Sequence, residues 1–393
     1  MISKLNNLFR KLFYATRTAL LALLVNAFFP SCAALAQQPE WVLIPDESRS
    51  AIWRVDSIGG VSKIDFASRR SNSKSGFDAR LNLNPSSNQL KLIYSRNNDL
   101  WLYDLESRNH RQLTRHGRPH TKKFASVYSE FSAWSPDGTS ILYVTKSGEI
   151  EAQGDEKYWK VEPLLASFGV KILSLITGEI TSHVLSSDWD LSGVIWFSDH
   201  KIMISSRGET GGHLDGQLNS YDFNSKEASK LLGQRGWYLG PKVSRNGNWA
   251  VIRVGTKAKF DSTEMMSARF DSSGLRSQIK LINLKTWEAI DVSPLENWAG
   301  IVTYAVSPSG ASVAYFKRNR GAMPDDPGGE LMVNKTAVFK SSHAPRIFWI
   351  NESTLALVNE NLPTDDSPKI LILNWQTGNV VGEFALPLNA VNR

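Results

Sequence analysis

The histidines are the side chains of this sequence best suited to chemistry. Four of them, together with a glutamine close to one of them, lie in connecting segments between predicted strands: His116, His120, His213, His343 and Gln217. Imidazole nitrogens and side-chain oxygens bind divalent metals, but the spacing of these residues matches no metal-ligand signature. We therefore predict no metal site and no cofactor, and keep a histidine-bound divalent metal as the alternative.

Carboxylate pairs are the second group that could support catalysis, because paired acids can share a proton or bind calcium. The pairs are Asp155-Glu156, Asp325-Asp326 and Asp365-Asp366. None has EF-hand spacing, so we interpret them as solvated loop charge. The sequence also lacks a Gly-x-Ser-x-Gly elbow, a Walker loop and a His-Glu-x-x-His motif. We predict no catalytic residue, which favours a non-enzymatic protein.

The first 36 residues predict an export signal. A basic start without acidic residues precedes an apolar run from Ala19 to Phe29, and Ala34-Leu35-Ala36 gives the small-x-small cleavage pattern. The apolar run is shorter than the roughly 20 residues of a membrane span. Cys32 follows Phe29-Pro30-Ser31, a poor match to a lipoprotein signal. We expect a signal peptide over 1–36, with an uncleaved anchor as the alternative, and a periplasmic or secreted location for residues 37–393.

The charge of the expected mature chain is close to neutral. The whole chain has 45 Lys and Arg against 38 Asp and Glu, and four of the basic residues lie in the first 36 residues, which leaves a net charge of +3. Nucleic-acid binding would require clustered Lys and Arg in a clearly basic domain, so we exclude it. Residues 37–393 contain no cysteine and no second long apolar run. Disulfides and a membrane span are therefore not expected after cleavage.

Two kinds of β-hairpin alternate along the chain, which indicates an internal repeat. The first kind is clearest at residues 99–114, where an alternating strand, a polar turn and a second short strand follow one another. We count seven copies, at residues 52–66, 99–114, 171–185, 218–232, 279–293, 330–341 and 369–386. The second kind carries a turn such as Trp134-Ser135-Pro136-Asp137-Gly138, and we count six copies. Hairpins of two types at this period are typical of four-stranded propeller blades.

The turn at 134–138, with Asp99–Asp104 and Arg111–Thr114, resembles the repeat of TolB-like propellers and of the propeller domains of prolyl-oligopeptidase-type proteins. The resemblance implies an all-β fold, a β-propeller of four-stranded antiparallel blades. Seven outer hairpins favour seven blades, with six as the alternative. The first blade lacks an inner strand, which Leu388–Arg393 would supply. TolB carries a separate α/β domain before its propeller, and no room for one exists here. We therefore expect 37–393 to be a single domain.

Strand order predicts which face of the propeller binds. We call the four strands of a blade A to D. The short A–B and C–D turns then fall on one face of the propeller, and the B–C connections fall on the other face. The long insertions all fall between B and C strands, at residues 146–170, 206–217, 255–278, 317–329 and 359–368. Long loops on a compact repeat fold usually carry function. We therefore expect the loop-bearing face to be the binding surface.

We predict a monomeric propeller that binds an envelope protein or a peptide through this face. Aromatic side chains can stack on or grip such a partner, although packing between blades is an alternative role for them. The predicted contact residues are Tyr128, Trp189, Trp237, Trp298, Glu209, His213 and Asp215. The alternative function is a metal- or carboxylate-dependent lyase or hydrolase acting on a polysaccharide at the same face. It requires His116, His120, His213 and His343 to converge near the channel mouth.

Overall fold

The chain was analysed as a computed structural model, which describes residues 40–45, 51–65, 84–85, 90–96, 99–115, 123–149, 167–184, 190–207, 216–232, 237–257, 275–297, 300–319, 328–359 and 369–386. It divides into two compact units, Met1–Pro39 and Glu40–Arg393. The predicted signal segment and Cys32 lie outside the described residues. Within the described ranges, no helix is long and apolar enough to cross a membrane.

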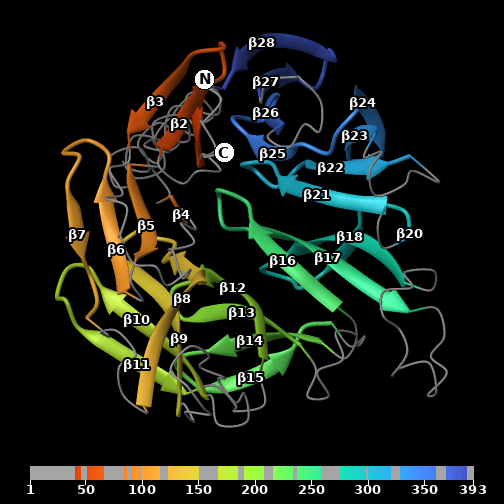
Figure 1. Ribbon diagram of the computed structural model, residues 1–393. Helices are drawn as coiled ribbons and strands as arrows, with labels where there is room; N and C mark the ends of the chain where they lie inside the picture. The colour runs from red at the N-terminus through yellow and green to blue at the C-terminus, as the bar shows by residue number, and fades with distance from the viewer. Residues whose placement is uncertain are drawn as a thin grey trace, which may run out of the picture. The chain divides into compact units, whose positions relative to one another are not determined.

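Residues 40–393 form a β-propeller of seven antiparallel sheets (Figure 1). Blade 1 contains β1 (Trp41–Pro45), β2 (Ala51–Asp56) and β3 (Val61–Asp65). Blade 2 contains β4 (Asn84–Pro85), β5 (Lys91–Arg96), β6 (Asp99–Asp104) and β7 (His110–Gln112). Blade 3 contains β8 (Lys123–Trp134), β9 (Ser140–Glu149), β10 (Ser167–Ser174) and β11 (Ile180–Val184). Blade 4 contains β12 (Asp190–Ser198), β13 (Lys201–Arg207), β14 (Gln217–Asp222) and β15 (Glu227–Lys230).

The last three blades follow the same order around the ring. Blade 5 contains β16 (Trp237–Val243), β17 (Trp249–Lys257), β18 (Leu275–Asn283) and β19 (Ala289–Asp291), with β20 (Glu296–Asn297) also paired to β18. Blade 6 contains β21 (Ile301–Val306), β22 (Val313–Arg318), β23 (Gly329–Val333) and β24 (Thr336–Ser341). Blade 7 contains β25 (Arg346–Trp349), β26 (Thr354–Asn359), β27 (Lys369–Asn374) and β28 (Asn379–Ala385).

The strand order confirms the predicted repeat. The structure contains the six A–B hairpins and the seven C–D hairpins, so the seven-blade prediction is confirmed and the six-blade alternative is wrong. Blade 1 has three described strands, which correspond to B, C and D. The expected closing strand at Leu388–Arg393 lies outside the described residues, so that closure stays a prediction.

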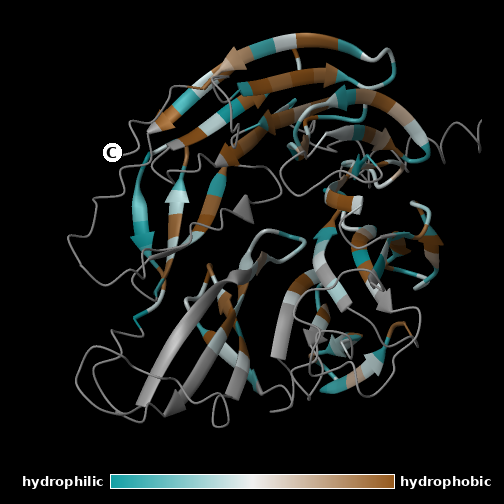
Figure 2. Ribbon diagram, turned by 45° about the vertical axis from the view of Figure 1, so that its right-hand side comes forward, coloured by the Kyte–Doolittle hydropathy of each residue, from teal (hydrophilic) through white to brown (hydrophobic). Residues whose placement is uncertain are grey.

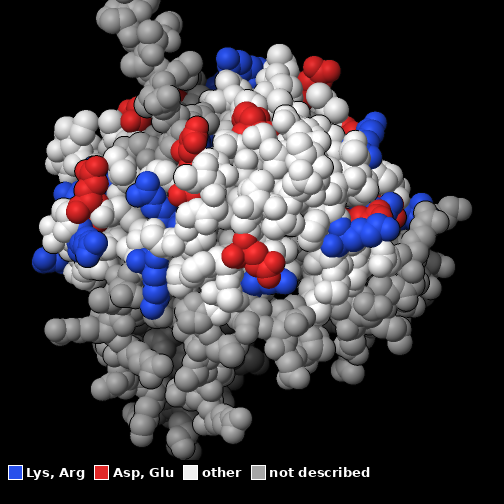
Figure 3. Space-filling view, turned by 90° about the horizontal axis from the view of Figure 1, so that it is seen from above, with Lys and Arg blue, Asp and Glu red and all other residues white. Residues whose placement is uncertain are grey.

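Burial changes from the inner to the outer strands of each blade. All six residues of the B strand β26 are buried, whereas all four residues of the D strand β15 are exposed. Figure 2 shows a second contrast, with apolar residues concentrated in the strands and polar residues in the turns between them. Where Figure 3 shows described residues, acidic and basic side chains are interspersed. The inner strands therefore form the core, and the outer strands lie against solvent.

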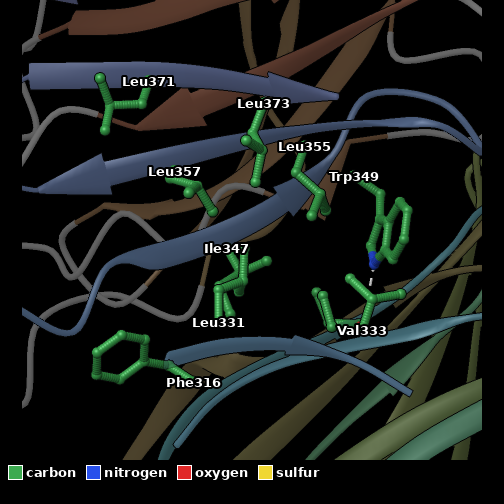
Figure 4. Close-up of a cluster of buried hydrophobic side chains, with 11 residues drawn as sticks. Phe316, Leu331, Val333, Ile347, Trp349, Leu355, Leu357, Leu371 and Leu373 are labelled. Atoms are coloured by element: carbon green, nitrogen blue, oxygen red, sulfur yellow. Dashed lines mark hydrogen bonds between the residues drawn. The ribbon is translucent and has the colours of Figure 1, made fainter. Parts of the chain in front are cut away.

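The core consists of layers between neighbouring blades rather than one central core, as expected for a repeat fold. Between blades 6 and 7, eleven buried side chains pack together, among them Phe316, Leu331, Trp349 and Leu357 (Figure 4). The indole nitrogen of Trp349 donates a hydrogen bond to the carbonyl oxygen of Ala305 at 3.1 Å, which joins the two inner strands. Burying an aromatic side chain of this size stabilises a fold by about 3–5 kcal/mol relative to alanine.

The A–B and C–D turns are short, and their polar groups form hydrogen bonds within the turn. In the predicted turn after Trp134, the carboxylate of Asp137 accepts hydrogen bonds from the Ser135 hydroxyl at 2.5 Å and the Thr139 amide at 3.0 Å. These bonds hold the pKa of Asp137 below its usual range, with the Ser135 hydroxyl as the largest cause. Gly138 adopts a φ of 73°, which favours glycine. This edge of the ring is the turn-bearing edge.

The B–C connections all leave from the opposite edge, which we call the loop-bearing edge. Strand register shows this directly, because the residues that flank each long connection are paired neighbours. The flanking pairs are Ser147↔Ser167, Ser206↔Gln217, Lys257↔Leu275, Arg318↔Gly329 and Asn359↔Lys369. Most residues of the connections lie outside the described part of the chain, but the strand ends that carry them all lie at one edge.

Candidate functional site

Four of the predicted partner-binding and ligand residues have described backbone positions at or near the loop-bearing edge, and one of them is His343. Trp237 begins β16 and pairs with Gly255, Tyr128 lies in β8 opposite Val144, and Gln217 begins β14. The remaining predicted contact residues lie outside the described residues: Trp189, Trp298, Glu209, His213 and Asp215. Their role in binding stays a prediction.

The predicted histidine site is described only at His343. This side chain is half-buried in the link between blades 6 and 7, and its Nδ1 lies 2.8 Å from the Ser342 hydroxyl. His116, His120 and His213 lie outside the described residues. Among the residues that are described, no group of three or more His, Cys, Asp and Glu could hold a metal ion. The alternative function as an enzyme requires these four histidines to lie close together, and that requirement therefore stays untested.

The other three histidines contact aromatic or acidic neighbours. His110 stacks on Tyr103 with 4.5 Å between ring centroids, and its Nδ1 lies 2.8 Å from the Tyr94 hydroxyl. The ring centroid of His183 lies 4.6 Å from that of Phe223, and burial lowers its pKa. These contacts fit a packing role for His110 and His183.

A group of basic side chains lies on the inner and second strands of blades 5, 6 and 7. We call it the cationic cluster, and it comprises Lys242, Arg253, Arg318 and Arg346. Lys242 is in β16, Arg253 in β17, Arg318 ends β22 and Arg346 begins β25. Arg253 is buried, Arg318 and Arg346 are half-buried, and Lys242 is exposed.

Hydrogen bonds between inner strands hold Lys242 in place. Its ammonium group donates to the carbonyl oxygen of Tyr304 at 2.6 Å and lies 5.3 Å from the centre of the Tyr304 ring. The Tyr304 hydroxyl donates in return to the carbonyl oxygen of Gly240 at 2.9 Å. Gly240 has a φ of 49°, and a Cβ there would crowd the Tyr304 hydroxyl at 2.9 Å. Glycine at this bulge therefore lets the two blades approach.

Burial and mutual repulsion set the protonation of this cluster. Desolvation, assisted by the charge of Arg346, lowers the pKa of Lys242 to about 8. Desolvation also lowers the pKa of Arg253 to about 10, with Arg318 repelling it and Tyr304 opposing the shift. Lys242 is exposed to solvent, yet desolvation is the largest cause of the lowering of its pKa. Its side chain therefore reaches solvent at a place that other parts of the protein surround closely. Burial also raises the pKa of Tyr304, which keeps its hydroxyl neutral.

This cluster was not predicted from the sequence. A net charge of +3 indicated an ordinary surface, because a total says nothing about where the charges gather. A local signal does exist in the sequence. Arg253 is a charged residue within the otherwise apolar segment from Ala250 to Val254, and Lys317-Arg318 ends the apolar strand β22. Arg and Lys are rarely buried in such strands without a specific reason.

One cavity opens on the turn-bearing edge, between blades 4 and 5. It has a volume of about 300 Å³ and is lined by Phe197, Ser198, His200, Lys201, Gly247, Asn248, Leu284, Lys285 and Trp287. The rings of Phe197 and Trp287 meet edge to face at 5.0 Å. His200 and Lys201 both approach Asp222, at 3.7 and 3.6 Å, so the acid of this region is already paired.

Comparison with known proteins identifies the architecture only. No protein-family model matches the chain, and no curated protein matches it. Oligogalacturonate lyase from Vibrio parahaemolyticus superposes with a TM-score of 0.57 at 12% identity, over 85% of this chain and 86% of the lyase. Dipeptidyl peptidase 4 from Porphyromonas gingivalis superposes with a TM-score of 0.54 at 10% identity, over 88% of this chain. The chain spans 58% of that peptidase.

The structural neighbours also include TolB proteins. TolB from Acinetobacter baumannii superposes with a TM-score of 0.40 at 10% identity, over 75% of this chain and 61% of TolB. The reported neighbours with TM-scores above 0.5 are a lyase and a peptidase, and a propeller scaffold hosts many unrelated activities. At these identities the comparisons show that the chain is a β-propeller.

Proposed function

We propose that this protein binds a partner protein or peptide of the cell envelope through the loop-bearing edge of its propeller. The observation that carries the proposal is strand register, because the five long connections all leave from that edge. The turn-bearing edge is built instead from short turns whose polar groups bond within the turns or to the next blade. Long connections on a rigid scaffold are where binding residues concentrate.

Binding in this proposal depends on shape and on burial of aromatic and charged groups, without bond chemistry. The propeller supplies rigidity, since each blade packs on its neighbours through buried apolar layers. A rigid scaffold reduces the entropy lost when a partner is bound. Trp237 at the start of β16, Trp298 and Tyr128 are the proposed aromatic contacts.

Site-specific photocrosslinking compares the two edges directly. A benzoylphenylalanine residue would replace Asn319 or Ser342, which are exposed at the loop-bearing edge, and Ile58 or Ile176, which are 85% and 78% exposed at the turn-bearing edge. Irradiation in envelope extract, followed by electrophoresis, should give a discrete adduct from Asn319 or Ser342 and none from Ile58 or Ile176.

A second arm tests the aromatic contacts. Affinity capture from the same extract should recover less partner with the Trp237→Ala, Trp298→Ala double variant than with the wild-type chain. Adducts formed only from Ile58 or Ile176 would overturn the choice of edge. Equal recovery by the wild type and the double variant would overturn the choice of tryptophans.

A further inference from the structure

The cationic cluster is continuous with the proposed binding edge. Arg318 is the last residue of β22, directly before a long B–C connection, and Arg346 is the first residue of β25, directly after the link from blade 6. Arg253 lies in the middle of β17, and Lys242 lies near the turn-bearing end of β16, opposite Val251. The ammonium group of Lys242 reaches the Tyr304 carbonyl of blade 6, and the neighbouring Thr303 donates to the carbonyl oxygen of Pro345, directly before Arg346. A partner on the loop-bearing edge of blades 5 to 7 would therefore meet positive charge first from Arg318 and Arg346.

Lys242 is held in position with spare hydrogen-bonding capacity. An ammonium group has three donors, and the described bond of Lys242 to the Tyr304 carbonyl uses one of them. That acceptor is neutral, so it positions the ammonium without cancelling its charge. The side chain is also exposed, so a ligand can reach it.

The neighbouring charges make the cluster attractive to an anion. Arg346 repels Lys242, and Arg318 repels Arg253. Such repulsion is strong where protein lowers the local dielectric constant. Two described acids near this edge of β22 already have partners, since Glu296 forms an ion pair with Lys317 at 2.7 Å and Glu330 forms one with Lys340 at 3.7 Å. A bound carboxylate would offset the repulsion and accept charge-assisted hydrogen bonds from Arg and Lys.

We infer that the cationic cluster binds a carboxylate of the partner, so that the contacting segment of that partner is an acidic peptide. This inference rests on the proposed function. Arg346 and Arg318 present guanidinium groups, whose planar donors match a carboxylate, and Lys242 supplies a point charge. Nucleic acid fits less well, because its backbone requires an extended basic surface, whereas the cationic cluster comprises four side chains on the strands of blades 5 to 7.

Fluorescence anisotropy with a defined probe tests this inference on the full mature chain. The probe is a fluorescein-labelled peptide of eight glutamates, and the matched peptide has eight glutamines. We expect saturable binding of the glutamate peptide only. Lys242→Gln and Arg346→Gln should each weaken binding about tenfold, the loss expected for one charge-assisted hydrogen bond.

Control variants separate charge from folding. Lys340→Gln removes a lysine whose side chain is 85% exposed in the outer strand β24, so binding should be unchanged. Lys242→Arg keeps the positive charge and should retain binding. Thermal unfolding of each variant shows whether a loss of affinity reflects a loss of structure.

Several outcomes would overturn the inference. These are equal affinity for the two peptides, an equal loss in Lys340→Gln and Lys242→Gln, or binding of trigalacturonate in place of the glutamate peptide, which would assign the cluster to an acidic saccharide. The proposed function is tested separately. If the glutamate peptide does not bind but Asn319 and Ser342 still crosslink to a partner, partner binding stands and the acidic-segment inference fails.

Discussion

The two edges of the propeller use polar groups in opposite ways. At the turn-bearing edge, side chains close their own turns or join one blade to the next. Asn246 of blade 5 donates to the Ser309 carbonyl at 2.7 Å, and Glu352 of blade 7 accepts from the Ser309 amide and hydroxyl at 2.5 and 2.8 Å. From the loop-bearing edge inward, along the strands of blades 5 to 7, the cationic cluster brings together groups that repel one another.

This difference separates stability from binding. A turn whose donors and acceptors are paired internally contributes to folding and offers little to a ligand. Like charges gathered near an edge cost stability, and they persist where a ligand or a specific geometry compensates them. Substitutions at the turn-bearing edge should therefore change the free energy of unfolding, and substitutions in the cationic cluster should change affinity.

The largest expected effect is on stability, at Gly310. This residue closes the A–B turn of blade 6 with a φ of 84°, and a Cβ there would overlap the side chain of Trp249 in blade 5. Gly247 closes the matching turn of blade 5 with a φ of 72° and open space around it. Gly310→Ala should cost about 2–4 kcal/mol, from backbone strain plus overpacking, and Gly247→Ala about 1 kcal/mol from strain alone.

Chemical denaturation of both variants measures that difference. Affinity for the glutamate peptide should be the same in Gly247→Ala as in the wild type. Equal costs at the two glycines would show that Trp249 moves aside easily, and that contact between blades 5 and 6 at this edge is loose.

A smaller effect is expected on binding as pH changes. The pKa of Lys242 is lowered to about 8 by desolvation and by Arg346, whereas the glutamates of the probe stay ionised above about pH 5. Affinity for the probe should fall several-fold between pH 7 and 9 as the ammonium loses its proton. Lys242→Arg should not show this fall, because guanidinium stays charged.

The same group should affect stability with the opposite sign. The pKa of Lys242 is lower in the folded chain than the usual 10.5, so the folded state binds fewer protons between pH 8 and 10.5. The contribution of Lys242 to stability should therefore rise across that window while affinity falls. A flat affinity profile from pH 7 to 9 in the wild type would remove Lys242 from the binding site.

The smallest expected effect is a gain in stability at Lys226. This exposed residue has a φ of 58° in the C–D turn of blade 4, where blades 3 and 7 place Gly178 and Gly378. Lys226→Gly should relieve the strain and raise the free energy of unfolding by about 0.5–1 kcal/mol. Lys230→Gly, in the exposed strand β15, should lower it by a similar amount because glycine weakens a strand. Thermal or urea unfolding distinguishes the two signs.

Much of the fold could be predicted because its signals are local and repeated. Alternation in segments such as Asp99–Asp104 and the turn at Ser135–Gly138 recur along the chain, and each copy reports a hairpin that forms from neighbouring residues. The weak copy at Glu330–Ser341 was also predicted, and it forms β23 and β24. Counting the hairpins gave the number of blades because each blade contributes one C–D hairpin.

The candidate site was harder to predict because its members are distant in the sequence. Lys242 and Tyr304 are 62 residues apart, yet the structure joins them at 2.6 Å. No spacing rule connects a bulge at Gly240 in one blade to a tyrosine in the next. The predicted aromatic and histidine residues were selected from connecting segments between predicted strands, for which the sequence gives no side-chain positions.

The sequence by itself therefore determined the repeat, the seven blades and the edge from which the long connections leave, since these follow from hairpin chemistry and strand order. Only the tertiary structure decided that Lys242, Arg253, Arg318 and Arg346 gather on neighbouring inner and second strands of blades 5 to 7. The physical reason is that a propeller packs neighbouring blades side by side, so charges from three separate repeats share one low-dielectric region. Composition sums those charges, but the fold sets the distances between them.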